Sequence, residues 1–302
     1  LYYDHNPNKW GDGEPVKETP EDTVVVFTFD VTANKISAKD DKVLAGAVFA
    51  MFTDKAAAEA AAADPSDANL AAALKFKEFN GVYKPSANGS AKFTGTGAYM
   101  VQGLDQGTYY LIEVAAPKGY ERTTVVSELK VAPVYDEAAF ENYTKGSSAL
   151  TNYPKDDATV TALNDITDIK ISKVDITNEE EVEGATIQII RIITDEEGKE
   201  VEDVVREWES TTAPQEIEGL ETGVEYILRE TIAPEGYDIA ADSKFVINED
   251  GTVTPIGSKV TPEGVILIED APVPELEKKV QENNRPGAEG QWNDVADYNI
   301  ND

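Results

Sequence analysis

The sequence feature that most constrains the fold is a strand pattern that occurs twice and ends each time on an inward-facing glutamate. Residues 109–113 (Tyr-Tyr-Leu-Ile-Glu) and 226–230 (Tyr-Ile-Leu-Arg-Glu) share this pattern, and side chains along a strand point alternately to its two faces. Glu113 and Glu230 therefore share a face with a tyrosine and a leucine. A carboxylate on an apolar face is costly unless it is paired or protonated. Because this arrangement occurs twice, we interpret both glutamates as chemically functional.

Turn sequences flank each glutamate strand in the same way. Gly-Leu and a second glycine precede it, at 103–107 and 219–223, and Ala-Pro-x-Gly-Tyr follows it, at 116–120 and 233–237. Glycine and proline at such positions are typical of turns. In both copies Gly-Tyr comes six and seven residues after the glutamate, which indicates a duplicated unit.

Each unit also has a lysine on an early strand and an amide or acid on a late strand. Lys35 and Lys173 each end a run whose alternate residues are apolar, and each precedes a Gly-Ala pair by the same interval. Asn164 and Asp270 end similar runs near the close of each unit. Strand alternation therefore predicts a lysine, a glutamate and an asparagine or aspartate on the apolar face of each unit.

These patterns predict an all-β protein built from tandem Ig-like β-sandwiches. The two predicted sandwich domains span residues 24–165 and 166–272. The first is longer because of an Ala-rich insertion at 54–74, expected to form one or two short helices broken near Pro65. Asp67 is the expected N-cap of the second helix. We expect no chemistry from this insertion.

Composition excludes several classes of function. The 58 acidic and 26 basic side chains give a net charge of −32, which disfavours binding to nucleic acid or to anionic membranes. No apolar run in this segment is long enough for a membrane-spanning helix. Cysteine is absent and His5 is the only histidine, which argues against disulfides, thiolate or multi-histidine metal sites and histidine-based catalysis. We expect neither a metal nor another cofactor.

A buried lysine, glutamate and asparagine or aspartate can react with one another. Burial lowers the pKa of an amine and raises that of a carboxylic acid, so the neutral amine is nucleophilic and the neutral acid can donate a proton. Rigid strands would hold the amine against the side-chain carbonyl. The product is a Lys-Asn or Lys-Asp isopeptide bond from a single-turnover reaction, so the chain is not expected to be an enzyme. The same residues could instead form a buried Lys-Glu ion pair, with the asparagine or aspartate only capping a strand end.

Three segments around these residues resemble a Cna B-type domain, as found in Gram-positive pilins and surface adhesins. They are 169–175 (Ile-Lys-Ile-Ser-Lys-Val-Asp), 228–237 (Leu-Arg-Glu-Thr-Ile-Ala-Pro-Glu-Gly-Tyr) and 268–271 (Ile-Glu-Asp-Ala). The resemblance implies isopeptide bonds Lys173–Asp270 and Lys35–Asn164, with Glu230 and Glu113 as proton shuttles. The first unit departs from the family pattern, because Val114 stands where threonine is usual. Asn152 is an alternative partner for Lys35.

The two ends of the chain are similar to parts of the isopeptide-forming middle domain of sortase-assembled fimbrial subunits. Residues 1–23 resemble the last strand of such a domain plus a linker, and residues 273–302 resemble the start of another. Asn6 and Lys278 would then be isopeptide residues of partial domains. We expect the chain to be a segment of a longer array of such modules.

The expected function is structural: a stalk or pilus-shaft segment, extracellular, at the cell wall or surface of a Gram-positive bacterium. Its expected partners are neighbouring pilin or stalk domains and a sortase, for which Lys155 in Tyr153-Pro154-Lys155 is a candidate linkage site. The alternative is an adhesin module that binds a host matrix protein or glycan. Such modules usually expose aromatic side chains in loops, whereas Trp10, Trp208 and Trp292 are scattered and are expected to pack. A glycosidase would need two carboxylates facing a cleft, and no motif indicates such a pair.

Overall fold

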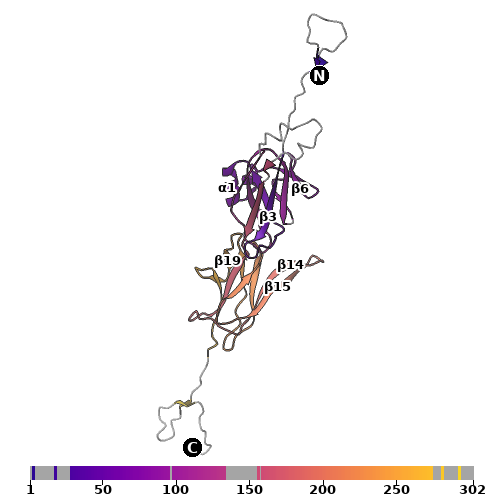
Figure 1. The fold of residues 1–302 in the computed structure, drawn as a ribbon. Coiled ribbons are helices and arrows are strands. Elements are labelled where there is room, and N and C mark those ends of the chain that lie inside the picture. The colour runs from indigo at the N-terminus through magenta and orange to yellow at the C-terminus, as the bar shows by residue number, and fades with distance from the viewer. Residues whose placement is uncertain are drawn as a thin grey trace, which may run out of the picture. The chain divides into compact units, whose positions relative to one another are not determined.

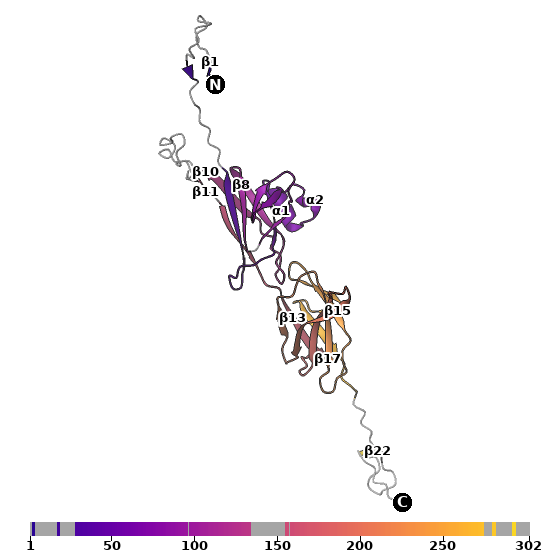
Figure 2. The same ribbon diagram turned by 90° about the vertical axis from the view of Figure 1, so that its right-hand side faces the viewer.

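The computed structural model describes residues 2–3, 17–18, 28–95, 97–133, 155–156, 158–274, 280–281 and 292–293 (Figures 1 and 2). The chain forms two compact units. The first unit comprises residues up to Pro117 together with Thr123–Asn164, and the second comprises Lys118–Arg122 and the residues from Asp165 onward. The predicted domain limits 24–165 and 166–272 remain predictions.

The first unit contains two five-stranded sheets, of orders β11-β10-β9-β4-β7 and β12-β3-β8-β6-β5. Its first and last long strands, β3 and β12, are neighbours and run parallel, with Ala162 opposite Lys35 and Asn164 opposite Ser37. The strands are β3 (Phe29–Ser37), β4 (Val48–Phe52), β5 (Phe76–Phe79), β6 (Val82–Pro85), β7 (Phe93–Thr94), β8 (Ala98–Leu104), β9 (Gly107–Ala115), β10 (Ser127–Pro133), β11 (Lys155–Asp156) and β12 (Ala158–Asn164).

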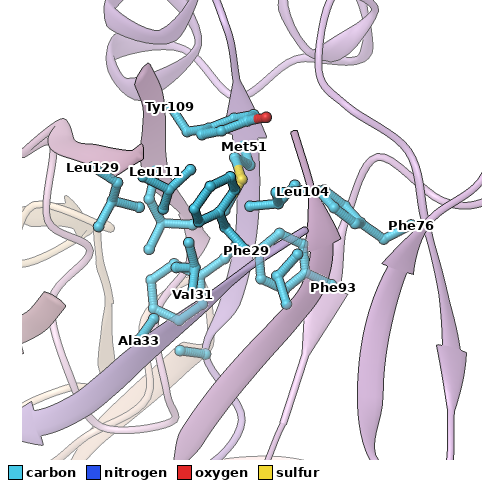
Figure 3. Close-up of a cluster of buried hydrophobic side chains, with 14 residues drawn as sticks. Phe29, Val31, Ala33, Met51, Phe76, Phe93, Leu104, Tyr109, Leu111 and Leu129 are labelled. Atoms are coloured by element: carbon cyan, nitrogen blue, oxygen red, sulfur yellow. The ribbon is translucent and has the colours of Figure 1, made fainter. Parts of the chain in front are cut away.

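The core of the first unit lies between these two sheets. Every second residue of β3 is buried, so Phe29, Val31 and Ala33 point inward, as the alternation predicts. Figure 3 shows them close to Leu111 of β9 and Met51 of β4, which come from the opposite sheet. Apolar residues from both sheets therefore enclose the space into which the next inward residue of β3, Lys35, also points.

The Ala-rich insertion forms two short helices, α1 (Lys55–Ala63) and α2 (Asp67–Leu70), labelled in Figure 2. The side chain of Asp54 caps α1 by accepting a hydrogen bond of 2.8 Å from the N–H of Ala57. The prediction that Asp67 caps α2 was wrong. Ser66 is the N-cap residue because its backbone is still extended, and Asp67 is already the first helical residue.

The insertion covers the outer face of β4 and β9. Ala58, Ala61 and Leu70 pack with Ile112 and Val114 in a second apolar cluster. The strand β9 is consequently buried on both faces, because Glu113 and Leu111 point to the inner core. Strand alternation predicted only the inner face, since a period of two says nothing about what covers the other side.

The second unit repeats the arrangement with a four-stranded sheet, β16-β13-β21-β20, and a five-stranded sheet, β15-β14-β17-β18-β19. The strands β13 and β21 are parallel neighbours, with Lys173 opposite Ile268 and Asp175 opposite Asp270. The strands are β13 (Asp168–Asp175), β14 (Thr186–Thr194), β15 (Glu200–Glu209), β16 (Gln215–Glu218), β17 (Glu225–Ile232), β18 (Ser243–Ile247), β19 (Val253–Ile256), β20 (Lys259–Val260) and β21 (Val265–Asp270). The predicted all-β class with a helical insertion is confirmed.

In the second unit, the glutamate strand carries a paired arginine on its outer face. Arg229 of β17 stands where the first unit has Ile112, and its guanidinium pairs with Glu202 and Asp242 at 2.8 and 2.9 Å. Trp208 packs against the core of this unit, as expected. The two units thus share the inner face of the glutamate strand but differ on its outer face.

Short strand pairs occur toward both ends of the chain, β1 (Tyr2–Tyr3) with β2 (Lys17–Glu18) and β22 (Val280–Gln281) with β23 (Trp292–Asn293). The predicted terminal residues Asn6 and Lys278, the alternative partner Asn152, and Trp10 lie outside the described residues. Neither described helix is long and apolar enough to span a bilayer.

Candidate functional site

The first candidate site lies in the core between the two sheets of the first unit. Lys35 comes from β3, Asn164 from the end of β12 in the same sheet, and Glu113 from β9 in the opposite sheet. All three are at most 2% exposed. Each of these polar residues lies on the same face of its strand as the apolar residue two positions before it, and therefore points inward. The site therefore combines an amine, an acid and an amide in a dry interior.

The two carboxyl oxygens of Glu113 face different groups. Oε1 lies 3.3 Å from Nζ of Lys35. Oε2 accepts hydrogen bonds from Nδ2 of Asn164 at 2.7 Å and from the backbone N–H of Thr123 at 2.9 Å. Glu113 therefore bridges the lysine amine and the asparagine amide, which is the position a proton shuttle between them must occupy.

Burial changes the acid–base properties of Lys35. Removal from water lowers the pKa of its amine, and the nearby carboxyl of Glu113 acts in the opposite direction without cancelling the effect. A lower pKa increases the fraction of neutral amine, which is the nucleophilic form. Lys35 therefore has a larger fraction of nucleophilic amine than an ordinary surface lysine at the same pH.

The second candidate site has the same layout in the second unit. Lys173 comes from β13, Asp270 from the end of β21 beside it, and Glu230 from β17 in the opposite sheet, and none is more than 4% exposed. Nζ of Lys173 lies 3.2 Å from Oε1 of Glu230 and in direct contact with Oδ1 of Asp270. Oε2 of Glu230 accepts a hydrogen bond of 2.5 Å from the N–H of Ala240. The structure thus brings together all three predicted residues of each unit.

Burial is also the main influence on Glu230. Desolvation raises the pKa of its carboxyl, and the negative charge of Asp270 acts in the same direction. The N–H of Ala240 and the charge of Lys173 oppose this rise but do not reverse it. Glu230 therefore retains its proton to higher pH than a free glutamate, as a proton donor in this position requires.

Several contacts at these sites were missed by sequence reasoning. The N–H groups of Thr123 and Ala240 are backbone donors, which no side-chain motif can mark. Asp175 and Tyr237 form a further pair beside the second site, with Oη of Tyr237 donating to Oδ2 of Asp175 at 2.8 Å. The repeated Gly-Tyr spacing was the available signal, but it predicted only a turn.

The departure at Val114 has a structural reason. Val114 is 7% exposed and packs under the helical insertion, whereas its counterpart after Glu230, Thr231, is exposed. A valine suits the covered face and a threonine suits the exposed one. Lys155 lies in the two-residue strand β11, opposite Pro133 of β10. It belongs to neither site.

The sequence matches the family described as "SpaA: Prealbumin-like fold domain" over residues 29–144 and 167–259, more than half of the chain. The chain belongs to this SpaA family. Each matched range contains the lysine and the glutamate of one site. The predicted relation to sortase-assembled pilins and pilus adhesins is confirmed at this level. The finer Cna B-type assignment remains a prediction.

Solved structures similar to this SpaA-family chain include pilins and pilus adhesins. A streptococcal ancillary pilin is 20% identical (TM-score 0.33), with 82% of this chain and 63% of the pilin covered, so the chain spans less than two thirds of that protein. A C-terminal fragment of pilus adhesin SpaC from Lactobacillus rhamnosus GG is 14% identical (TM-score 0.37; 83% and 99% covered). Shaft pilin SpaA from the same organism is 16% identical (TM-score 0.28; 83% and 100% covered). No curated protein matches the chain.

Proposed function

We propose that this chain is a structural segment of a stalk or pilus shaft on a Gram-positive cell surface, stiffened by two self-formed isopeptide bonds. The bonds join Lys35 to Asn164 and Lys173 to Asp270, with Glu113 and Glu230 as proton shuttles. The observation that carries the proposal is the repeated burial of an amine, an acid and a carbonyl acceptor at equivalent places in both units.

Charge balance favours the crosslink over a buried ion pair, most clearly in the second unit. If Lys173, Glu230 and Asp270 were all ionised, one negative charge would stay uncompensated in the core. An unpaired buried ion costs several kcal/mol even after the protein relaxes. Condensation of Lys173 with Asp270, beside a protonated Glu230, leaves only neutral groups. In the first unit an ionised Lys35 would be balanced by an ionised Glu113, so charge balance favours the crosslink less clearly there.

In the first unit, the reaction releases ammonia. The neutral Nζ of Lys35 attacks Cγ of Asn164 while Glu113 donates its proton to the carbonyl oxygen. Glu113 then takes a proton from Nζ and delivers it to Nδ2, which leaves as ammonia when the C–N bond to Nδ2 breaks. The remaining hydroxyl proton returns to Glu113, which ends as it began. The hydrogen bond of 2.7 Å between Nδ2 and Oε2 places the shuttle beside the leaving group.

In the second unit, the acceptor is a carboxylic acid and the reaction releases water. Nζ of Lys173 attacks Cγ of the Asp270 carboxyl group, a step that requires the neutral acid, and Glu230 moves the proton from Nζ to a hydroxyl of the tetrahedral intermediate. The C–O bond to that hydroxyl breaks, water leaves and an amide remains. The contact of Nζ with Oδ1 of Asp270 places the nucleophile next to the reacting carbon.

The positions of the proposed bonds suit a protein under tension. Each bond would join the first long strand of a unit to its last, and these strands are parallel neighbours. A pull on the chain would pass from one strand to the other through the bond, so the residues between them would not be extended. The chain lacks cysteine, so isopeptide bonds would provide the covalent stabilisation that disulfides provide in other proteins.

A surface location and the partners follow from the same proposal. We expect neighbouring modules of the same kind along the chain and a sortase that joins subunits, with Lys155 as the candidate linkage residue. Binding of a host matrix protein or glycan is the alternative function. Trp208 does not support this alternative, because it packs against the core of the second unit.

Intact mass spectrometry of the denatured chain tests the proposal. We expect the mass to fall short of the sequence mass by one ammonia and one water. In Glu113→Ala only the water should be missing, and in Glu230→Ala only the ammonia. A wild-type mass equal to that of the unmodified sequence would contradict the crosslinks and support the ion-pair interpretation.

A further inference from the structure

The glutamates of both sites make the same hydrogen bond to a residue ten positions further along the chain. Oε2 of Glu113 accepts from the N–H of Thr123, and Oε2 of Glu230 accepts from the N–H of Ala240, at 2.9 and 2.5 Å. The other oxygen, Oε1, faces the lysine in both units, at 3.3 and 3.2 Å. The two oxygens therefore have fixed and different surroundings.

In the second unit, the turn after β17 brings Ala240 back to Glu230. Gly236 adopts a left-handed conformation with φ of 85°, and the N–H of Tyr237 bonds to the carbonyl of Pro234 at 3.2 Å. Tyr237 then pairs with Pro272, two residues beyond Asp270. The Ala-Pro-x-Gly-Tyr sequence thus ties the end of the acceptor strand to the segment that hydrogen-bonds the glutamate.

A backbone N–H can only donate, so the oxygen that it contacts must present a lone pair. Either oxygen of a carboxyl group can present one, so the N–H fixes the orientation of the group. An N–H fixed at Oε2 therefore holds the carboxyl group with Oε1 turned toward the lysine amine. In the second unit this N–H is the only donor to Oε2 among the described residues, so its loss frees the carboxyl group to rotate away from the amine.

We propose that the backbone N–H groups of Thr123 and Ala240 are positioning groups that hold the glutamate carboxyl group with one oxygen facing the lysine amine. This inference rests on the proposed isopeptide chemistry and deepens it. The N–H of Ala240 has a second effect, because it opposes the rise in the pKa of Glu230 caused by burial. It thereby helps the buried acid to release the proton that the reaction moves.

Replacement of Ala240 by proline tests the role, because proline has no N–H. The full chain would be made in a cell-free system, sampled over time at several pH values, and digested to follow each crosslink. We expect Ala240→Pro to form the Lys173–Asp270 bond about tenfold more slowly, since a hydrogen bond to a charged group is worth that factor or more. Formation of the Lys35–Asn164 bond in the same molecules should be unchanged and serves as the internal standard.

Two matched variants separate the lost N–H from a general effect of proline. Ala240→Gly retains the N–H and should react at the wild-type rate. Ile239→Pro places proline one residue earlier, at a residue that is 59% exposed and whose N–H bonds to no group among the described residues, and it should also react normally. In the first unit, the same comparison is made between the rates of bond formation in Thr123→Pro, which lacks the N–H, and Thr123→Ala, which retains it.

The pH profile distinguishes positioning from loosened structure. Loss of a hydrogen bond to the carboxylate form raises the pKa of Glu230 further, so the alkaline limit of the reaction in Ala240→Pro should move to higher pH. A loosened loop would slow the reaction without this shift. A wild-type rate and profile in Ala240→Pro, or an equal loss in Ile239→Pro, would overturn the positioning role. If the wild-type chain forms no bond at all, the proposed function itself fails.

Discussion

Replacing the first cluster by apolar residues, in the triple variant Lys35→Met/Glu113→Leu/Asn164→Leu, should lower the free energy of unfolding of the first unit by about 4 to 5 kcal/mol. The proposed bond closes a loop of more than 100 residues, and a crosslink across such a loop is worth about that much through the entropy of the unfolded chain. The corresponding fall in the melting temperature is on the order of 10–20 °C. Denaturant and thermal unfolding of the full chain, followed by circular dichroism, measure both.

The triple variant separates the two interpretations because they predict opposite signs. Replacing a buried ion pair with apolar residues of similar volume is often neutral or stabilises a protein by about 1–4 kcal/mol. An unchanged or raised stability would therefore support the ion pair and contradict the crosslink. Lys42→Met, at an exposed lysine of the same unit, is the matched control and should change stability very little.

The second large effect should be seen when single molecules are pulled from their ends. In the wild-type chain, the proposed bonds shield residues 36–163 and 174–269, so these 128 and 96 residues should not contribute to the extension. In Glu113→Ala/Glu230→Ala both segments become extensible. The variant should gain roughly 400 Å and 300 Å of contour length in two steps, at about 3.4 Å per residue. Force spectroscopy measures these steps directly.

The single variants are the controls for this experiment, since each should gain only the step that belongs to its own unit. Glu113→Ala should show the longer step and Glu230→Ala the shorter one. If the wild-type chain itself shows both steps, then no covalent bond bridges either unit. This result would contradict the proposal that the chain is a crosslinked structural segment.

Strand alternation was sufficient to predict the inward positions of the candidate site residues. In an extended strand the side-chain period is two, so an apolar partner two residues away fixes the face of Lys35, Glu113 or Asp270. Repetition in two units provided an independent check on each strand. The sequence favoured Asn164 as the partner of Lys35 but left Asn152 open, because the choice depends on which segment lies beside β3.

Other features could not be predicted because they depend on contacts between segments distant in sequence. The burial of Val114 follows from helices inserted some 50 residues earlier, which cover a strand face that would otherwise be exposed. The start of α2 at Asp67 rather than after it was missed because serine and aspartate are both good N-caps, and the backbone conformation of Ser66 decides between them. The N–H groups of Thr123 and Ala240 leave no trace in side-chain chemistry.

The most direct test of the central claim is tandem mass spectrometry of a tryptic digest of the wild-type chain. If Lys173 is joined to Asp270, trypsin cannot cleave after Lys173, and peptide 171–191 should be recovered covalently linked to peptide 260–278 with the loss of one water. Fragment ions should place the link on Lys173 and Asp270. Full recovery of the separate linear peptides 174–191 and 260–278 would contradict the account.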